Sequence, residues 1–464
     1  MATATAIPSW VGLVGSVPTS DRPKVPSPSP ALVLGLAWAV AFSLRSGFIG
    51  VGPILPDLAA DLNLSNTAAS ALVAVPTLMM GLVAVAGGAL ADRWGPARAI
   101  ALGLAGVALG GGLRPVTESW LPLLVATVLF GAGIGLAQPA LPRLMRGLFP
   151  RRLGLSTGIY ASGLVAGSIL AASLTLPVEE RFFPEAGWRG PLLLWGALAA
   201  ATLAVWLLVL RPWSWPGPGT AAAVSIDAVD RNRGARRAGP SGHPPPATPS
   251  AGAQWPVSAT HHRQPIIPTW SPWRDRDAWV VALLCAAQGV GYYLLIAWLP
   301  AVYRDLGIDA AGSGLLFALF NAATLPAILG FPILSDRIGS RRLPCLIAAG
   351  IFTLGALGYV LGPVAFPLAW LWPMLAGAGV AALFAMTLVL PTDVAPAGSV
   401  GAAAGMVLAI GYAGSALGPV LAGAVRDLTG GFETALATLP VIGLLTLLLA
   451  AAVPPPGRRS PRGT

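Results

Sequence analysis

Residues 88–98 of the chain read GALADRWGPAR, and residues 332–342 read PILSDRIGSRR. The two stretches carry Asp, Arg and Gly at matching places, separated by a constant shift of 244 residues. The same shift superposes Leu55-Pro56 on Leu299-Pro300 and Asp61-Leu62 on Asp305-Leu306. A single ungapped shift that holds over this length predicts that the chain consists of two repeats of one fold.

The segments around these stretches have the composition of a membrane protein. Apolar residues make up 55% of the chain and charged residues 10%, whereas a soluble domain carries about 25% charged residues. Twelve apolar segments of about 20 residues are each long enough to cross the hydrocarbon core of a bilayer. We expect them to begin near Ala31, Thr67, Arg98, Leu121, Leu153, Gly187, Ala278, Gly312, Leu343, Pro367, Ser399 and Phe432. The sequence therefore predicts an all-α membrane protein with an N-terminal six-helix bundle, 31–210, and a C-terminal six-helix bundle, 278–453.

Three further segments are predicted to stay outside the bundles. Residues 211–277 are rich in Pro, Gly, Ser and Arg and cannot bury a core, so we expect a disordered linker, with tails at 1–30 and 454–464. With the N-terminus placed in the cytoplasm, 22 of the 28 Lys and Arg residues lie in cytoplasmic segments. Five lie in outer loops: Arg114, Arg181, Arg189, Arg304 and Arg426. This asymmetry predicts that both termini are cytoplasmic, and it explains the net charge of +10 without a nucleic-acid partner.

The loop at 88–98 resembles the signature loop of the major facilitator superfamily, with a second copy at 332–342. Three other stretches resemble the cyanate/2-nitroimidazole transporter family within it: Leu44-Arg45 followed by 51–56, residues 149–158, and Gln288 with Tyr293 and 297–300. The resemblance runs from about Leu32 to Ala450, the linker excepted. It implies a transporter of a small solute such as cyanate or a nitroaromatic compound. The chain departs from the superfamily pattern at Pro96 and Ala97, where basic residues are usual.

Arg45 is the most informative residue for function. It lies about 13 residues into the first apolar segment, too deep to reach water easily, and a central Arg costs at least about 2.5–3.5 kcal/mol on insertion scales. All 18 Asp and Glu residues fall in tails, loops or segment ends. Arg45 therefore lacks an obvious counter-ion, and we expect it to bind an anionic or strongly polar solute through its planar guanidinium. The alternative is a structural Arg that donates to carbonyl groups of a neighbouring helix.

Other candidate solute-binding residues follow from helical spacing and from the repeat. Phe48 shares a face with Arg45, and Gln288 and Tyr292 share a face of the seventh segment. The shift of 244 residues pairs Thr77 with Asn321. The full set of predicted binding residues is Arg45, Phe48, Thr77, Gln138, Gln288, Tyr292 and Asn321, with Tyr160 and Tyr412 as further candidates. For each polar member the alternative is ordinary hydrogen bonding between helices.

The charged residues of the two repeated loops are predicted to act as gating residues, through ion pairs that form and break as the transporter changes state. They are Asp92, Arg93 and Arg98 in the first loop, and Asp336, Arg337 and Arg342 in the second. The alternative is that their positive charge only fixes the topology.

Catalysis and metal binding have little support in the sequence. The two cysteines, Cys285 and Cys345, are isolated in apolar segments, and the three histidines lie in the linker. We therefore expect no catalytic residues, no metal, no cofactor and no obligate protein partner. The sequence indicates a multi-pass transporter of the bacterial cytoplasmic membrane that moves a small anionic or polar solute by alternating access. An exporter of neutral drug-like compounds and a membrane receptor or scaffold are the alternatives.

Overall fold

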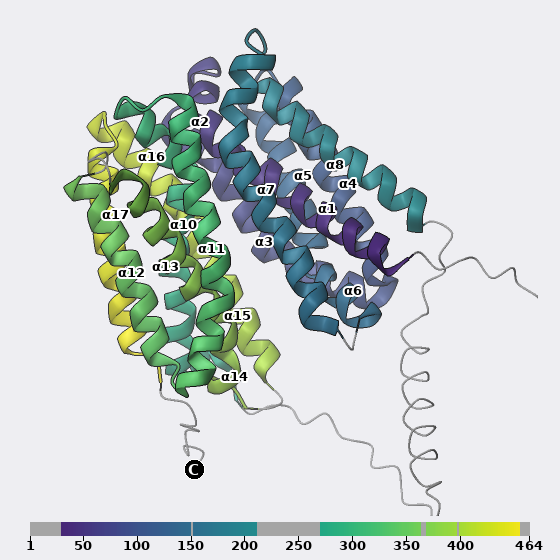
Figure 1. Cartoon of the computed structure of the whole chain (residues 1–464), viewed down its shortest axis with the longest axis vertical. Helices are drawn as coiled ribbons and strands as arrows, with labels where there is room; N and C mark the ends of the chain where they lie inside the picture. Colours follow the sequence, from purple (N-terminus) through teal and green to yellow (C-terminus); the bar gives the residue numbers. More distant parts are fainter. Residues whose placement is uncertain (1–28, 150–151, 211–269, 363–367, 397–398, 455–464) are drawn as a thin grey trace, which may run out of the picture.

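The computed structural model describes residues 29–149, 152–210, 270–362, 368–396 and 399–454, which form long helices joined by short turns (Figure 1). The predicted tails and linker lie almost wholly outside the described residues, which leave out 1–28, 211–269 and 455–464. The end of the predicted linker that is described contains a short 3-10 helix, η3 (Pro272–Arg274), and the first residues of α10, which begins at Arg276.

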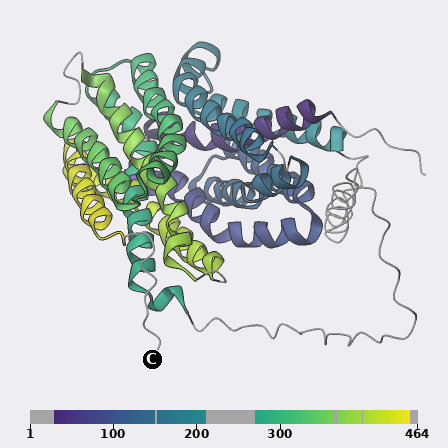
Figure 2. The same cartoon turned by 60° about the horizontal axis from the view of Figure 1, so that its bottom comes forward.

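The helices divide between the two predicted bundles. The N-terminal bundle contains α1 (Pro30–Ile49), α2 (Val51–Asp61), α3 (Asn66–Trp94), α4 (Pro96–Leu113), η1 (Arg114–Val116), α5 (Trp120–Ala137), α6 (Ala140–Leu148), α7 (Leu153–Phe182) and α8 (Arg189–Leu210). The C-terminal bundle contains α10 (Arg276–Asp305), α11 (Ala310–Ile338), α12 (Arg342–Leu361), η4 (Leu368–Trp370), α13 (Leu371–Val389), α14 (Pro391–Val394), α15 (Val400–Ser415), α16 (Leu417–Thr429) and α17 (Glu433–Ala451). Figure 2 shows the two sets of helices on separate sides of the molecule.

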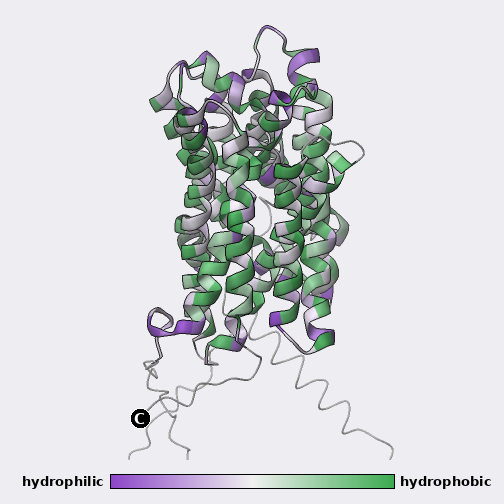
Figure 3. Ribbon diagram, turned by 90° about the vertical axis from the view of Figure 1, so that its left-hand side faces the viewer, coloured by the Kyte–Doolittle hydropathy of each residue, from purple (hydrophilic) through white to green (hydrophobic). Residues whose placement is uncertain are grey.

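Twelve helical segments of the described chain are long and apolar enough to span a membrane, which confirms the predicted number. Successive helices combine into single spans in several cases, such as Pro30–Asp61, which joins α1 and α2, and Val400–Thr429, which joins α15 and α16. Hydrophobic residues occupy the middle of the helices, and hydrophilic residues gather at both ends (Figure 3). The chain is therefore a multi-pass membrane protein.

The repeat predicted from the sequence extends to details of the backbone. Gly95 and Gly339, which the shift of 244 residues pairs, both have positive φ, at 89° and 68°. Asn63 and Gly307 are paired in the same way and have φ of 50° and 85°. Positive φ favours Gly or Asn, so the repeated loops need these residues to turn between helices.

The two bundles meet at one end of the molecule and diverge toward the other (Figure 1). We call the end where α8 finishes, α10 begins and α17 finishes the linker end, and the opposite end the far end. Contacts between the bundles join α2 to α10, α7 to α11, and α3 to α15 and α16. At the far end they are close enough that a Cβ atom on Gly52 of α2 would overlap the carbonyl oxygen of Ile296 on α10.

Candidate functional site

Arg45 lies near the middle of the first span, and its exposure differs from that of its neighbours. Every residue from Val40 to Leu55 is buried except Arg45, which is half-buried. On α10, every residue from Gly291 to Tyr303 is buried except Tyr292. Arg45 and Tyr292 are thus the partly exposed residues of these two buried stretches, and they lie in different bundles.

The C-terminal bundle presents three tyrosines to Arg45. The guanidinium group lies within electrostatic range of Tyr292, Tyr293 and Tyr412, and it is in polar contact with Tyr293. Its Nη1 atom is shielded from solvent and has no hydrogen-bond partner. No carboxylate of the described residues forms an ion pair with Arg45. The cation therefore faces neutral phenol groups and keeps a donor free.

Gln138 completes this central cluster from the N-terminal bundle. It follows the last residue of α5, where its backbone N–H donates to the Ile134 carbonyl at 2.9 Å, and its side chain is in polar contact with Tyr412 of α15. Gln138 and Tyr412 are both half-buried, like Arg45. The structure thus brings together Arg45, Gln138 and Tyr292 with the further candidate Tyr412, and it adds Tyr293.

Aromatic rings surround the tyrosines. Phe48 is fully buried and meets Tyr293 edge to face, with ring centroids 5.9 Å apart. Tyr292 stacks against Phe320 of α11 at 5.7 Å and meets Tyr293 edge to face at 5.0 Å. These contacts fix the tyrosine rings, so their hydroxyl groups are held in place beside the guanidinium. Phe48 supports the cluster from behind.

Three other predicted binding residues use their polar atoms within their own helices. Thr77 Oγ1 donates to the Val73 carbonyl at 2.7 Å, and Asn321 Nδ2 donates to the Phe317 carbonyl at 2.9 Å. Gln288 Nε2 donates to the Cys285 carbonyl at 2.9 Å. All three side chains are buried. Their role in binding a solute stays a prediction.

Polar contacts close the bundles together at the far end. Asp427, at the end of α16, accepts hydrogen bonds from the backbone N–H groups of Asn66 and Thr67 at 2.9 and 2.8 Å. It also accepts from Asn66 Nδ2 at 2.7 Å and from Thr67 Oγ1 at 2.6 Å. A carboxylate of the C-terminal bundle therefore caps the first turn of α3 in the N-terminal bundle, where the helix dipole favours an anion.

Two further contacts cross the same end. Arg304 of α10 forms an ion pair with Asp57 of α2, with 2.7 Å between Nη1 and Oδ2. Ser70 of α3 donates to the Pro419 carbonyl at 2.8 Å, and Trp298 Nε1 lies 3.2 Å from the Ser70 hydroxyl. The far end is closed in this conformation.

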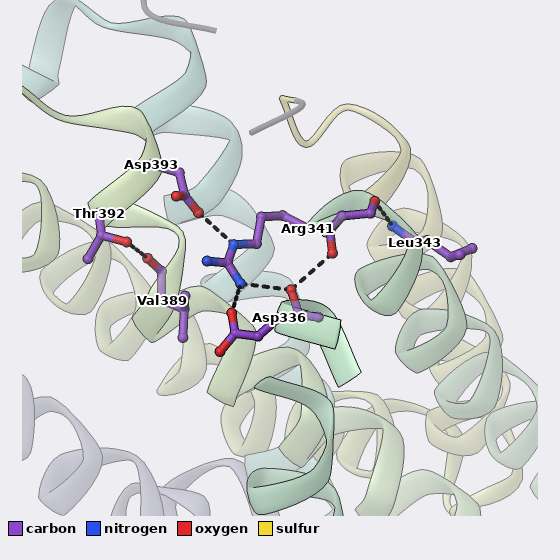
Figure 4. A network of polar contacts seen from close by, with 8 residues as sticks. Asp336, Arg341, Leu343, Val389, Thr392 and Asp393 are labelled. Atoms are coloured by element: carbon purple, nitrogen blue, oxygen red, sulfur yellow. Dashed lines mark hydrogen bonds and ion pairs between the residues drawn. The ribbon is translucent and has the colours of Figure 1, made fainter. Parts of the chain in front are cut away.

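At the linker end, the repeated loops pair with groups of their own bundles. Asp92 accepts from Arg143 of α6 at 3.0 Å. In the second loop, Arg341 donates to Asp336 at 2.6 Å, to Asp393 at 2.8 Å and to Ser335 Oγ at 3.0 Å (Figure 4). The hydrogen bond to Asp336 raises the pKa of Arg341 above its ordinary value. These pairs tie α3 to α6 and α11 to α14, each within one bundle.

The predicted gating set is therefore only partly engaged. Asp92 and Asp336 form ion pairs, whereas Arg93, Arg98, Arg337 and Arg342 form none with any described residue. The partner of Asp92 is Arg143 and the partner of Asp336 is Arg341, which also pairs with Asp393. None of these three partners was in the predicted set. Arg341 lies within the repeated loop, and this position was the one feature of the sequence that could have marked it as a gating candidate. A role in gating remains a prediction for all these residues.

Arg114 lies in the connection between α4 and α5, where the sequence predicts an outer loop, and it is buried, with 2% of its surface exposed. Its guanidinium carbon lies 3.7 Å from the centroid of the Phe130 ring, and Nη2 donates to the Gly47 carbonyl at 3.4 Å. Arg114 is buried because it begins η1, which packs against α4, α5 and α8.

Two repeated bundles of membrane-spanning helices, with a half-buried polar cluster between them, define a membrane transporter. No group of three His, Cys, Asp or Glu residues among those described could hold a metal ion. The chain belongs to the Major Facilitator Superfamily, whose family model matches residues 37–375 and 281–464.

Relatives in this superfamily agree with the resemblance seen in the sequence. The uncharacterized transporter YycB of Bacillus subtilis is 27% identical over 90% of this chain and 90% of its own length. The cyanate transport protein CynX of Escherichia coli is 27% identical over 89% of this chain and 95% of its own. The 2-nitroimidazole transporter of Escherichia coli is 25% identical over 89% and 93%. All three relatives are transporters, which are not enzymes, and this chain is likewise a transporter and not an enzyme.

Solved structures show the same fold. The inward-open xylose transporter XylE of Escherichia coli superposes with a TM-score of 0.66 and 14% identity, covering 92% of this chain and 97% of its own. The fold class predicted from the sequence is thereby confirmed.

Proposed function

We propose that this protein transports a small anionic solute by alternating access, and that Arg45 binds the solute between the bundles. The observation that carries the proposal is the environment of Arg45: a central guanidinium with an unpartnered nitrogen, facing three tyrosines of the opposite bundle. An unpaired cation in the membrane is costly, and an anion that binds to it between the bundles would offset that cost.

The neighbouring groups favour a small solute with several acceptor atoms. A phenol oxygen can accept from Arg45 while its own proton donates to the solute, and the Gln138 amide adds two further donors. Charge-assisted hydrogen bonds of this kind contribute about 1.5–3 kcal/mol each. A planar or linear anion matches the planar fork of donors that the Arg45 guanidinium presents.

The names of two relatives support this class of solute. One is a cyanate transport protein, and the other transports 2-nitroimidazole. Cyanate is a small linear anion, and 2-nitroimidazole is a small planar ring with a polar nitro group. We propose a cyanate-like anion as the solute of this chain, and an uncharged nitroaromatic-like solute is the alternative that the binding test distinguishes.

The arrangement of contacts supports a two-state cycle. The bundles are joined at the far end by Asp427 and by the Asp57–Arg304 pair, while the loop ion pairs at the linker end stay within single bundles. We propose that the linker end and both termini are cytoplasmic, as the distribution of Arg residues predicts. The structure would then be an inward-facing state of a protein of the bacterial cytoplasmic membrane.

Binding to the purified protein tests the proposal. Thermal stability would be measured with cyanate, nitrate and benzoate as anions and with 2-nitroimidazole as an uncharged solute. We expect at least one anion to stabilise the wild type and Arg45→Gln to weaken its binding about 10- to 100-fold, the loss of one charge-assisted interaction. Arg45→Lys should also weaken binding, because an ammonium group lacks the planar fork.

Two variants separate the cluster from its surroundings. Tyr412→Phe removes one hydroxyl and should weaken binding about fivefold, near 1 kcal/mol. Thr77→Val should leave binding unchanged if the Thr77 hydroxyl serves only its bond to Val73, and weaker binding would place Thr77 in the site. Anion binding that persists at full strength in Arg45→Gln would disprove the proposal, and stabilisation by 2-nitroimidazole alone in both proteins would favour a carrier of neutral compounds.

A further inference from the structure

A separate hollow lies at the linker end of the C-terminal bundle, away from Arg45. Its volume is about 260 Å³, and its lining includes Arg276, Asp277 and Val280 at the start of α10, Arg342 at the start of α12, and residues 451–454 after α17. Of its lining residues, Arg342 belongs to the predicted gating set, and the proposed solute site uses none of them. The volume is below the roughly 300–1,000 Å³ of pockets that bury a drug-sized molecule, so only a small polar group fits.

The two arginines of this hollow are free to bind a ligand. Within the described part of the chain, neither Arg276 nor Arg342 forms an ion pair, whereas Arg143, Arg304 and Arg341 do. Each stands in the first turn of a long helix, of 30 residues for α10 and 20 for α12, where the helix dipole adds positive potential. With Asp277 included, the lining carries a net charge of +1, which one phosphodiester group neutralises.

The level of the hollow identifies the source of such a group. Three membrane spans begin or end at its lining residues: Arg276–Asp305, Arg342–Leu361 and Thr434–Ala451. It therefore lies where hydrocarbon meets water, the depth of lipid headgroups. Trp273 and Trp279, beside it in sequence, are 57% and 37% exposed, with ring centroids 6.0 Å apart. Exposed Trp side chains are enriched at this depth.

We infer that this hollow binds the headgroup of an anionic phospholipid. The phosphodiester lies between Arg276 and Arg342, and Asp277 accepts a hydrogen bond from a hydroxyl of the headgroup. Phosphatidylglycerol has both features, whereas phosphatidylcholine has the phosphate but no donor. Basic pockets at the ends of membrane helices are suited to such headgroups.

The repeat provides a matched control. The shift of 244 residues pairs Arg342 with Arg98, at the start of α4, but pairs Arg276 with Leu32. The N-terminal bundle thus has one of the two arginines at the equivalent place, and Arg98 does not line the hollow. Arg98→Gln removes the same charge from the same kind of helix start without touching the site.

Lipid titration of the full chain in detergent, followed by native mass spectrometry, tests the inference. We expect phosphatidylglycerol to bind more tightly than phosphatidylcholine. Each basic residue near a membrane surface contributes about 1 kcal/mol to binding anionic lipid, so Arg276→Gln combined with Arg342→Gln should weaken phosphatidylglycerol about 30-fold. Arg98→Gln should leave its affinity unchanged.

Asp277→Asn provides a change of opposite sign that misfolding cannot imitate. Removing this negative charge should strengthen the binding of the phosphate group about threefold or more, even though one acceptor is lost. Equal affinity for phosphatidylglycerol in the wild type and the double Arg variant would overturn the inference. Displacement of the lipid by excess inorganic phosphate would also overturn it, because the site would then serve a free anion and not a headgroup.

Discussion

Asp427→Asn should shift the protein from the far-end-closed state toward a far-end-open state. The Asp427 carboxylate accepts four hydrogen bonds from Asn66 and Thr67, at 2.6–2.9 Å. An amide has one oxygen to accept with, and its NH₂ group would face donors. The substitution therefore removes a contact that exists only while the bundles touch at the far end.

The size of the effect follows from the geometry. Loss of an Asp cap costs about 0.5–2 kcal/mol, and two of the four bonds come from side chains across the interface. Asp427 is exposed, so hydrogen bonds to water replace part of the four lost hydrogen bonds. We therefore take about 2 kcal/mol as the free energy that the whole contact contributes to the far-end-closed state. That is a factor of about 30 in the equilibrium between states. If the far-open state is about 1% of the wild type, it should reach about 20% in the variant.

Distances between spin labels at the far end would measure this population. Glu118, which is exposed between η1 and α5, and Leu361, 82% exposed at the end of α12, lie on different bundles and outside the interface. Labels on Glu118→Cys and Leu361→Cys, with Cys285 and Cys345 replaced by Ala, should show a second, longer distance when Asp427→Asn is added.

Asp305→Asn is the matched control. Asp305 also ends a helix at the far end and pairs with Arg426 at 3.3 Å, but both residues belong to the C-terminal bundle. Its substitution should leave the distances as in the wild type. If Asp427→Asn gives the wild-type distribution, the carboxylate does not hold the bundles together and the reasoning fails.

Two other substitutions have definite expected outcomes. Gly52→Val should lengthen the same far-end distances, because its side chain would overlap the Ile296 carbonyl across the interface. Gly163→Val is the control, because its side chain would overlap the Trp38 carbonyl within one bundle. It should lower thermal stability and leave the far-end distances unchanged. Arg114→Met should leave the stability of the fold unchanged or raise it by about 1 kcal/mol, because apolar replacement of a buried charge is often neutral or stabilising. Nε and Nη1 of Arg114 are buried without hydrogen-bond partners. A large drop in melting temperature would show that the guanidinium is needed over the Phe130 ring.

The sequence predicted the framework well because length and hydropathy determine which segments cross a membrane. It also predicted the repeat, and the paired residues Gly95 and Gly339 share a positive φ. Arg45 was identifiable because an Arg at mid-span is costly wherever it points. None of these inferences needed the rotation of a helix about its axis.

Rotation is what the sequence could not supply. In a membrane, lipid and protein interior are both apolar, so a hydrophobic stripe does not mark the buried face as it does in a soluble helix. Spacing from Gln288 led to Tyr292, which does lie near Arg45, but the adjacent Tyr293 also contacts the guanidinium. Thr77 and Asn321, paired by the repeat, share the same bond to a carbonyl four residues earlier. The repeat correctly indicated that Thr77 and Asn321 are equivalent residues, but it did not show which groups they contact.

The contacts between bundles carry the least signal in sequence, and they set the energetics of the cycle. Asp427 is not matched by a capping carboxylate at position 183, which is Phe, so the far-end contact belongs to one repeat only. The central cluster, in contrast, draws Arg45 and Gln138 from one bundle and tyrosines from the other. A solute held there touches both halves, and it can favour a state only by binding that state more tightly. Because the far-end contact is worth about 2 kcal/mol by the estimate above, a differential affinity of about 30-fold between the two states is enough to offset it. The Asp57–Arg304 pair is half-exposed and Asp427 is exposed. Exposed ionic contacts are weak one by one, as the proposed two-state cycle requires of the contacts that close the far end.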